Sequence, residues 1–248
     1  MAGHSSWKNI KHRKAAVDAK RGKMWSRCAR VIIIAARGGG GDPTSNLSLR
    51  YAIDDAKFYN MPKDTIEKAI KKGTGELASE SIEAAMYEGY AHGVAFLIEI
   101  LTDNRNRTAG DIRHIFEKNG GQLGKSGSVA YLFSPKGQLM LAKDGLDEDT
   151  IMSVALDAGA EDVTDAGDAW QVMTAPGDFM TVRQAIEKAG LKPVTAELTQ
   201  VPSTTVTLTG EVADQVMKIV DLLDDYDDVQ KVHANFEIAE SELEKARA

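Results

Sequence analysis

Cationic side chains gather at the start of the chain, and they are the residues best suited to a chemical role. Residues 1–37 hold five Lys, five Arg and one Asp, a net charge of +9, whereas the whole chain carries −7. The other residues therefore carry about −16, and such a separation of charge is typical of a protein that holds a polyanion at one end. The side chains of this block that could contact a nucleic acid are Trp7, Lys8, Lys11, His12, Arg13, Lys14, Lys20, Arg21, Lys23, Arg27 and Arg30.

Contact with backbone phosphates is the chemistry that this block predicts. If six of the side chains meet phosphates, the logarithm of the binding constant falls with the logarithm of salt concentration at a slope of roughly −5, about a thousandfold between 50 and 200 mM. Trp7 could stack on a base, but phosphate contacts position a protein without reading sequence. Two alternatives stay open: a solvated tail, and neutralisation of the block by the acidic body of the same chain.

Arg105 and Arg107 form a second candidate, in the stretch TDNRNRTAGDIR (102–113). This stretch follows a predicted strand and opens a predicted helix, whose N-terminal N–H groups and dipole favour an anion. The two arginines either contact a phosphate of a nucleic acid or pair with Asp103, Asp111 or the acidic body.

Other motifs do not support a cofactor, a metal or catalysis. GGQLGKSGS (120–128) has Asn119 where a phosphate-binding loop needs Gly, and it precedes a strand rather than a helix, so we predict a flexible turn. DDYDD (224–228) lacks the Gly and the distal Glu of a calcium loop, which predicts a solvated helix end. The five His residues and Cys28 show no ligand spacing. We expect no cofactor and no small-molecule substrate, and an enzyme with an unrecognised interdomain site is a remote alternative.

Three helices are predicted to carry the end of the basic block. Residues 1–20 hold little apolar surface and predict an arm. From Arg21, apolar residues recur with helical spacing until the glycines at 38–41. Asn46 is positioned to cap a second helix, and a third has Pro62 in its first turn and Gly73 just past its end. These helices predict a compact domain that ends near residue 80.

The period then changes to mixed strands and helices. Strands are predicted at 93–101, 128–133, 204–210 and 229–238, with helices at 108–118 and 212–223. The helix at 108–118 has the spacing of a capping box at Thr108 and Asp111. Tyr131 and Phe133 fall on one face of their predicted strand, where they either stack on bases or belong to the core. Between these elements we predict strands at 136–142, 168–175 and 194–201 and helices at 151–158 and 179–189.

We therefore predict the α+β fold class, with an N-terminal three-helix domain followed by two ferredoxin-like α+β domains, the third inserted into the second. The predicted domains are 1–80 for the basic arm and helical domain, 81–134 plus 204–240 for the discontinuous second domain, and 135–203 for the inserted third. No apolar run approaches the length of a membrane span, and the single Cys fits a reducing compartment. We expect a cytoplasmic protein, with a monomer favoured. An Arg-rich start is also found in mitochondrial targeting peptides, but Asp18 and the following helix favour mature sequence.

The order and spacing of several long motifs are similar to those of the YebC family. These are GHSSWKNIKHRKAAVDAKRGK at the start, then GGGGDPTSN, NMPKDTIEKAIKKGTG, YEGY, LTDNRNRTAGDIRHIFEKNGG, GSVAYLF and DDVQKVHANFEI. The chain departs from the family pattern at two places. Ser6 and Lys8 stand where Lys and a small residue are common, which leaves the charge unchanged, and Ala91-His92-Gly93 replaces a turn richer in glycine and proline. The resemblance extends over nearly the whole chain.

The resemblance implies three domains and a non-enzymatic, cytoplasmic regulator of gene expression. Family members are commonly described as DNA-binding transcriptional regulators, and others, including the mitochondrial translational activator of cytochrome c oxidase, as ribosome-associated translation factors. Nucleic acid is therefore the expected partner, as DNA or as RNA in the ribosome. The family signature places contacts at Lys8, Lys11, His12, Arg13, Lys14, Lys20, Arg21 and Lys23, and less directly at Arg105 and Arg107.

Overall fold

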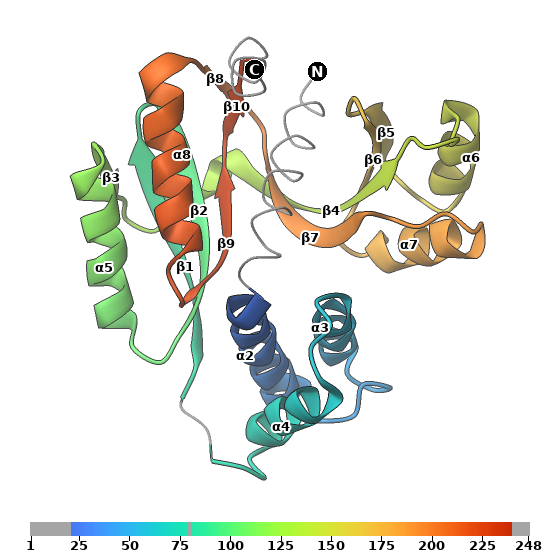
Figure 1. The fold of residues 1–248 in the computed structure, drawn as a ribbon, viewed down its shortest axis with the longest axis horizontal. Helices are drawn as coiled ribbons and strands as arrows, with labels where there is room; N and C mark the ends of the chain where they lie inside the picture. Colours follow the sequence, from blue (N-terminus) through green and yellow to red (C-terminus); the bar gives the residue numbers. More distant parts are fainter. Residues whose placement is uncertain (1–20, 79–80, 240–248) are drawn as a thin grey trace.

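Three helices form the N-terminal part of the computed structural model, which describes residues 21–78 and 81–239. They are α2 (Arg21–Gly39), α3 (Leu47–Phe58) and α4 (Lys63–Thr74) (Figure 1). Ile32, Leu49 and Ala56 lie at the centre of their shared core and are fully buried. The Asn46 side chain accepts a hydrogen bond from the Leu49 N–H at 3.0 Å, which confirms the predicted cap of α3.

The end of α4 differs from the prediction. Gly73 lies inside the helix and is buried, and Gly75 takes the left-handed conformation after its last residue, with φ of 84°. A Cβ atom at position 73 would lie 2.6 Å from the Ala36 Cβ atom and from the Ile33 carbonyl oxygen. Glycine is thus needed here for the close packing of α4 on α2 rather than for ending the helix. Pro62 precedes α4 as its N-cap instead of lying in the first turn.

A first four-stranded antiparallel sheet follows, in the order β3-β1-β2-β9. Its elements are β1 (Glu83–Ala91), β2 (Val94–Thr102), α5 (Arg105–Lys118), β3 (Gly121–Leu123), α8 (Gly210–Asp224) and β9 (Val229–Ala234). Alternate side chains of β2 (Phe96, Ile98 and Ile100) pack against α5 and α8 in one core. The spatial order is ferredoxin-like, but β1, a strand that was not predicted, comes first in the chain.

The predicted strand at 128–133 is wrong. Residues Ala130–Leu132 form a short 3₁₀ helix, and β4 begins at Phe133. Val129 and Phe133 are four residues apart and both pack on the helix-free face of the first sheet, whereas Tyr131 is 75% exposed. The Glu88 carboxylate fixes this turn because it accepts hydrogen bonds from the N–H groups of residues 127, 129 and 130, at 2.6, 2.6 and 2.9 Å. The two aromatic rings therefore do not share a face.

A second four-stranded antiparallel sheet has the ferredoxin-like order β5-β6-β4-β7. Its elements are β4 (Phe133–Ala142), α6 (Glu148–Asp157), β5 (Asp162–Asp165), β6 (Ala169–Thr174), α7 (Phe179–Lys188) and β7 (Thr195–Pro202). The chain enters and leaves this unit at one place, since the Ser203 N–H donates to the Leu132 carbonyl at 2.7 Å. The α+β class with an N-terminal helical region is confirmed, and the domain boundaries given above stay predictions.

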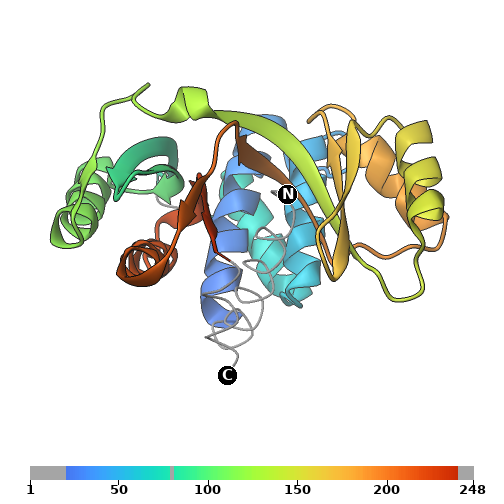
Figure 2. The ribbon, with the colours of Figure 1, turned by 90° about the horizontal axis from the view of Figure 1, so that it is seen from above.

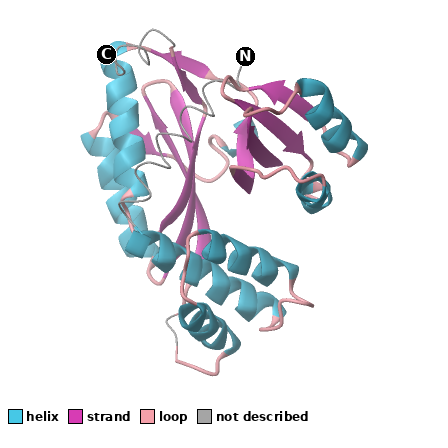
Figure 3. Cartoon of the chain, turned by 45° about the vertical axis from the view of Figure 1, so that its right-hand side comes forward, coloured by secondary structure: helices cyan, strands magenta, loops and turns pink. Residues whose placement is uncertain are grey.

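The remaining strands form a small parallel pair, β8 (Val206–Leu208) with β10 (Phe236–Ile238). The predicted strand 229–238 is thus divided between two sheets. Seen from above, α5 and α8 cover the outer side of the first sheet, and α6 and α7 cover the outer side of the second (Figure 2). Figure 3 shows the three N-terminal helices gathered at one end of both sheets. No helix within residues 21–78 and 81–239 is long and apolar enough to cross a membrane.

Candidate nucleic-acid interface

The predicted contact residues fall into three groups. Trp7, Lys8, Lys11, His12, Arg13, Lys14 and Lys20 lie outside the described residues. Arg21 is the first residue of α2, and the same helix carries Lys23, Arg27 and Arg30. Arg105 and Arg107 lie in the first turn of α5, which Asn104 caps by accepting a hydrogen bond from the Arg107 N–H at 3.1 Å. The predicted capping box at Thr108 and Asp111 is therefore wrong, because the helix starts one turn earlier.

The cationic side of α2 contacts an acidic turn, which we define as residues 224–228, between α8 and β9 (Figure 1). Lys23 Nζ lies 3.7 Å from Asp225 Oδ1. The Arg27 guanidinium donates a hydrogen bond to the main-chain carbonyl of Asp224, and that of Arg30 donates to the carbonyl of Asp227. Three of the residues predicted to contact nucleic acid thus contact oxygen atoms of the protein itself. This agrees with the alternative stated above, in which the acidic part of the same chain neutralises the basic block.

Asp228 is the centre of a buried polar cluster. The residue is only 3% exposed, and its Oδ2 atom accepts hydrogen bonds from the hydroxyls of Thr108 (2.7 Å) and Thr102 (2.9 Å). Arg107 Nη2 also lies 3.0 Å from Oδ2, and Arg30 Nη1 lies 3.2 Å from Oδ1. The prediction of a solvated helix end is wrong for this residue, because the carboxylate joins α2, β2 and α5.

The electrostatics of this cluster favour the charged carboxylate. Burial alone would raise the pKa of Asp228, but the Thr108 hydroxyl and the Arg107 guanidinium outweigh burial and hold the pKa below its ordinary value. In return, Asp228 and then Asp103, whose Oδ1 atom is 2.7 Å from Arg107 Nη2, raise the pKa of Arg107. Arg107 is therefore paired with acids of the chain, whereas Arg105 is exposed.

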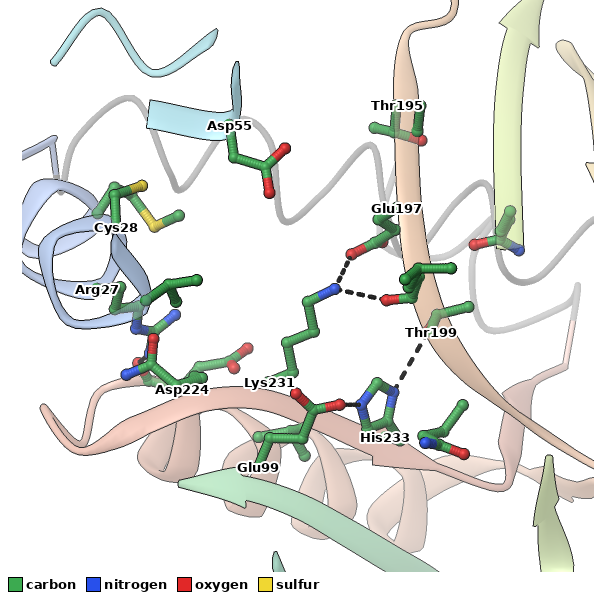
Figure 4. Close-up of a pocket in the computed structure, with 18 of the residues that line it drawn as sticks. Arg27, Cys28, Asp55, Glu99, Thr195, Glu197, Thr199, Asp224, Lys231 and His233 are labelled. Atoms are coloured by element: carbon green, nitrogen blue, oxygen red, sulfur yellow. Dashed lines mark hydrogen bonds and ion pairs between the residues drawn. The ribbon is translucent and has the colours of Figure 1, made fainter. Parts of the chain in front are cut away.

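An open cleft of about 1970 Å³ lies between α2 and α3, the helix-free face of the first sheet, and β7. Lys231 of β9 contacts β7 through Glu197 Oε2 (2.8 Å) and the Leu198 carbonyl (2.7 Å) (Figure 4). His233 lies 2.8 Å from Glu99 Oε1. Burial lowers the pKa of Lys231, but Glu197 more than offsets this and raises it. Lys231 and His233 are thus each paired with an acid, across β9 and β7 and across β9 and β2.

The sequence did not single out these cleft residues. Lys231 and His233 alternate with Val232 of the core along β9, which is the one signal that both lie on a second face. Their partners are more than 30 residues away and cannot be read from spacing. Burial raises the pKa of the Cys28 thiol to about 11, so it is protonated at neutral pH and is a poor nucleophile. Among the described residues, no group of three or more His, Cys, Asp and Glu is arranged to hold a metal ion.

Comparisons with known proteins agree with the three-part architecture. Family models described as the TACO1/YebC protein N-terminal domain and the TACO1/YebC second and third domain match residues 5–76 and 82–236. A Persephonella marina protein named "Probable transcriptional regulatory protein" is 52% identical over 248 residues, which are 99% of both chains. A protein of the same name from Pelotomaculum thermopropionicum is 53% identical and covers 96% of this chain and 99% of its own.

A solved structure supports the same relationship. The crystal structure of a conserved hypothetical protein from Aquifex aeolicus has a TM-score of 0.82 and 45% sequence identity, and the match covers 90% of this chain and 93% of the other. The two family models together match most of the chain, from residue 5 to residue 236. The protein therefore belongs to the TACO1/YebC family.

Proposed function

We propose that this protein is a cytoplasmic regulator of gene expression that binds nucleic acid, and specifically a DNA-binding transcriptional regulator of the YebC type. The observation that carries the proposal is the separation of charge, with +9 on residues 1–37 of a chain whose total is −7. Relatives named as transcriptional regulatory proteins at about 50% identity support it. The protein binds the phosphates of the nucleic acid. The acidic remainder of the chain repels them, so the contact is limited to the basic end of the chain.

A second candidate is a translation factor that contacts RNA of the ribosome. The contacts of α2 support this second candidate. Lys23, Arg27 and Arg30 are directed at one acidic turn and are not spread along a helix that could enter the major groove of DNA. Phosphate contacts of that kind do not distinguish DNA from ribosomal RNA.

Fluorescence anisotropy with a labelled DNA duplex, together with co-sedimentation with ribosomes, tests both candidates. The variant Lys11→Glu/Arg13→Glu/Lys14→Glu should lose binding while its melting temperature stays within about 2 °C, since the sequence of residues 1–20 has little apolar content and predicts an arm outside the cores. The control is Lys188→Glu/Lys192→Glu/Lys218→Glu, which changes the net charge equally at three exposed lysines. Equal loss in both variants would contradict a specific role of the basic block.

The two assays separate the candidates by target. Tight, salt-dependent binding to a promoter duplex without ribosome association supports transcription. Co-sedimentation with ribosomes that is lost between 50 and 200 mM salt, at a slope of roughly −5, supports translation.

A further inference from the structure

The acidic turn occupies the atoms with which α2 would bind phosphate. A guanidinium or ammonium group donates hydrogen bonds to a phosphate oxygen in the same way as to a carboxylate or carbonyl oxygen. The turn supplies both kinds of oxygen, namely the carbonyls of Asp224 and Asp227 and the carboxylate of Asp225. The contacts of Lys23, Arg27 and Arg30 to the turn therefore compete with any contact of the same side chains to a polyanion.

The turn carries more acid than its structural role requires. Four of its five residues are Asp, and Asp228 is the one that is buried in the polar cluster. The Asp225 side chain is 52% exposed, and Asp227 is also exposed. Surface ion pairs of this kind contribute little to stability. Their charge nevertheless lies directly beside the cationic side of α2, where it acts on anything that approaches that side.

Few apolar contacts attach the helical core to the first sheet, so the two can separate at the acidic turn. Among the described residues, Ile82 and Leu101 are the buried apolar side chains that the sheet unit contributes to the helical core. Ile82 immediately precedes β1, and Leu101 lies near the end of β2, whereas the contacts at the turn are polar. Polar contacts at a rim are readily exchanged for equivalent contacts to a ligand.

We propose that the acidic turn is an autoinhibitory contact: Asp224, Asp225 and Asp227 occupy the cationic groups of α2, and nucleic acid binds through α2 only by displacing these three residues, while Asp228 stays in the buried cluster. This inference rests on the proposed function. It implies that the intact protein binds nucleic acid more weakly than its basic residues allow, and that neutral side chains in the turn strengthen binding.

The test compares three forms of the full-length chain by anisotropy with a labelled DNA duplex and with a single-stranded RNA. The turn variant is Asp224→Asn/Asp225→Asn/Asp227→Asn, which leaves Asp228 and every carbonyl in place. The control is Asp144→Asn/Glu148→Gln/Asp149→Asn, which removes the same charge from three exposed positions of the second sheet unit. At 50 mM salt we expect the turn variant to bind about tenfold more tightly than the control, since one charge at ion-pair distance changes binding roughly fivefold in water and screening reduces the sum.

A third variant shows that the gain acts through α2. In a Lys23→Gln/Arg27→Gln background, the same turn substitutions should give no gain beyond that of the control. If the turn variant binds like the control while the native protein binds well, the autoinhibitory contact is refuted and the proposed function stands. If neither the native protein nor any variant binds DNA or RNA, the proposed function fails and the inference fails with it.

Discussion

Replacing Asp228 by Asn tests whether the buried polar cluster holds α2, β2 and α5 together. The substitution keeps the shape of the side chain but removes its charge and replaces one acceptor oxygen by a donor NH₂ group. Native Asp228 accepts bonds from two hydroxyls at 2.7 and 2.9 Å and faces two guanidinium groups at 3.0 and 3.2 Å. In the variant at least one guanidinium must face a donor.

The expected cost follows from these contacts. Removing one partner of a fully buried ion pair costs about 3–5 kcal/mol. The Arg30 and Arg107 side chains are 27% and 47% exposed and can be hydrated, so the cost should be lower, about 2–3 kcal/mol. At about 2–4 °C per kcal/mol for a chain of this size, the melting temperature of the protein should fall by roughly 5–10 °C.

Thermal unfolding by circular dichroism, with Asp227→Asn as the control, measures this cost. Asp227 is exposed and Arg30 contacts only its main-chain carbonyl, so the control should lie within about 0.5 kcal/mol of the native protein. Because the folded pKa of Asp228 lies below its unfolded value of about 3.9, its stabilisation is complete above that value and is lost as the pH falls through the folded pKa. The difference between native protein and variant should therefore shrink below about pH 4. Equal melting temperatures of Asp228→Asn and Asp227→Asn at pH 7 would refute the reasoning.

Three further substitutions or reactions test other parts of the structure. Glu88→Gln should destabilise the protein by about 2 kcal/mol and speed hydrogen exchange at Gly127 and Val129, because the carboxylate that accepts from both N–H groups is lost, whereas the exposed Glu83→Gln should do neither. Gly89→Ala should lower the unfolding free energy by about 2–3 kcal/mol in urea titration, since its Cβ would lie 2.3 Å from the Phe116 ring, while Gly110→Ala, with open space around its Cβ, should raise it by up to about 1 kcal/mol. Alkylation of Cys28 by iodoacetamide at pH 8 should be about a hundredfold slower in the native protein than in guanidinium, because burial raises the thiol pKa from 9.0 to about 11, and equal rates would contradict this.

Elements with a complete internal pattern could be predicted from the sequence. The inner face of α2, the continuous apolar run of β2 and the periodic residues of α8 each carry their own signal, and each element lies where expected. β1 was missed because its sequence, EAAMYEGYA, holds no β-branched residue and includes a glycine that Phe116 requires. Where packing against another element determines the residue types of a strand, the sequence of that strand alone does not predict it.

Two of the errors share one physical cause, which is a contact between distant parts of the chain. The turn at 127–130 is set by Glu88, about 40 residues earlier. Asp228 was assigned to solvent because its partners, Thr102 and Thr108, lie 126 and 120 residues away. Charge separation could predict a basic interface, but only the fold shows that an acidic turn faces Lys23, Arg27 and Arg30.

The hydrogen bond between Ser203 and Leu132 also determines how the chain responds to tension. The inserted sheet unit begins and ends at this pair, and the adjoining strands continue as an antiparallel ladder from Phe133 opposite Pro202. A force that pulls residues 132 and 203 apart loads this ladder at one end, so its hydrogen bonds break one after another rather than together. We expect the strands of the inserted unit to separate sequentially at low force. A protein-unfolding enzyme that pulls on the C-terminal part of the chain would detach β7 before it disturbs α6 or α7.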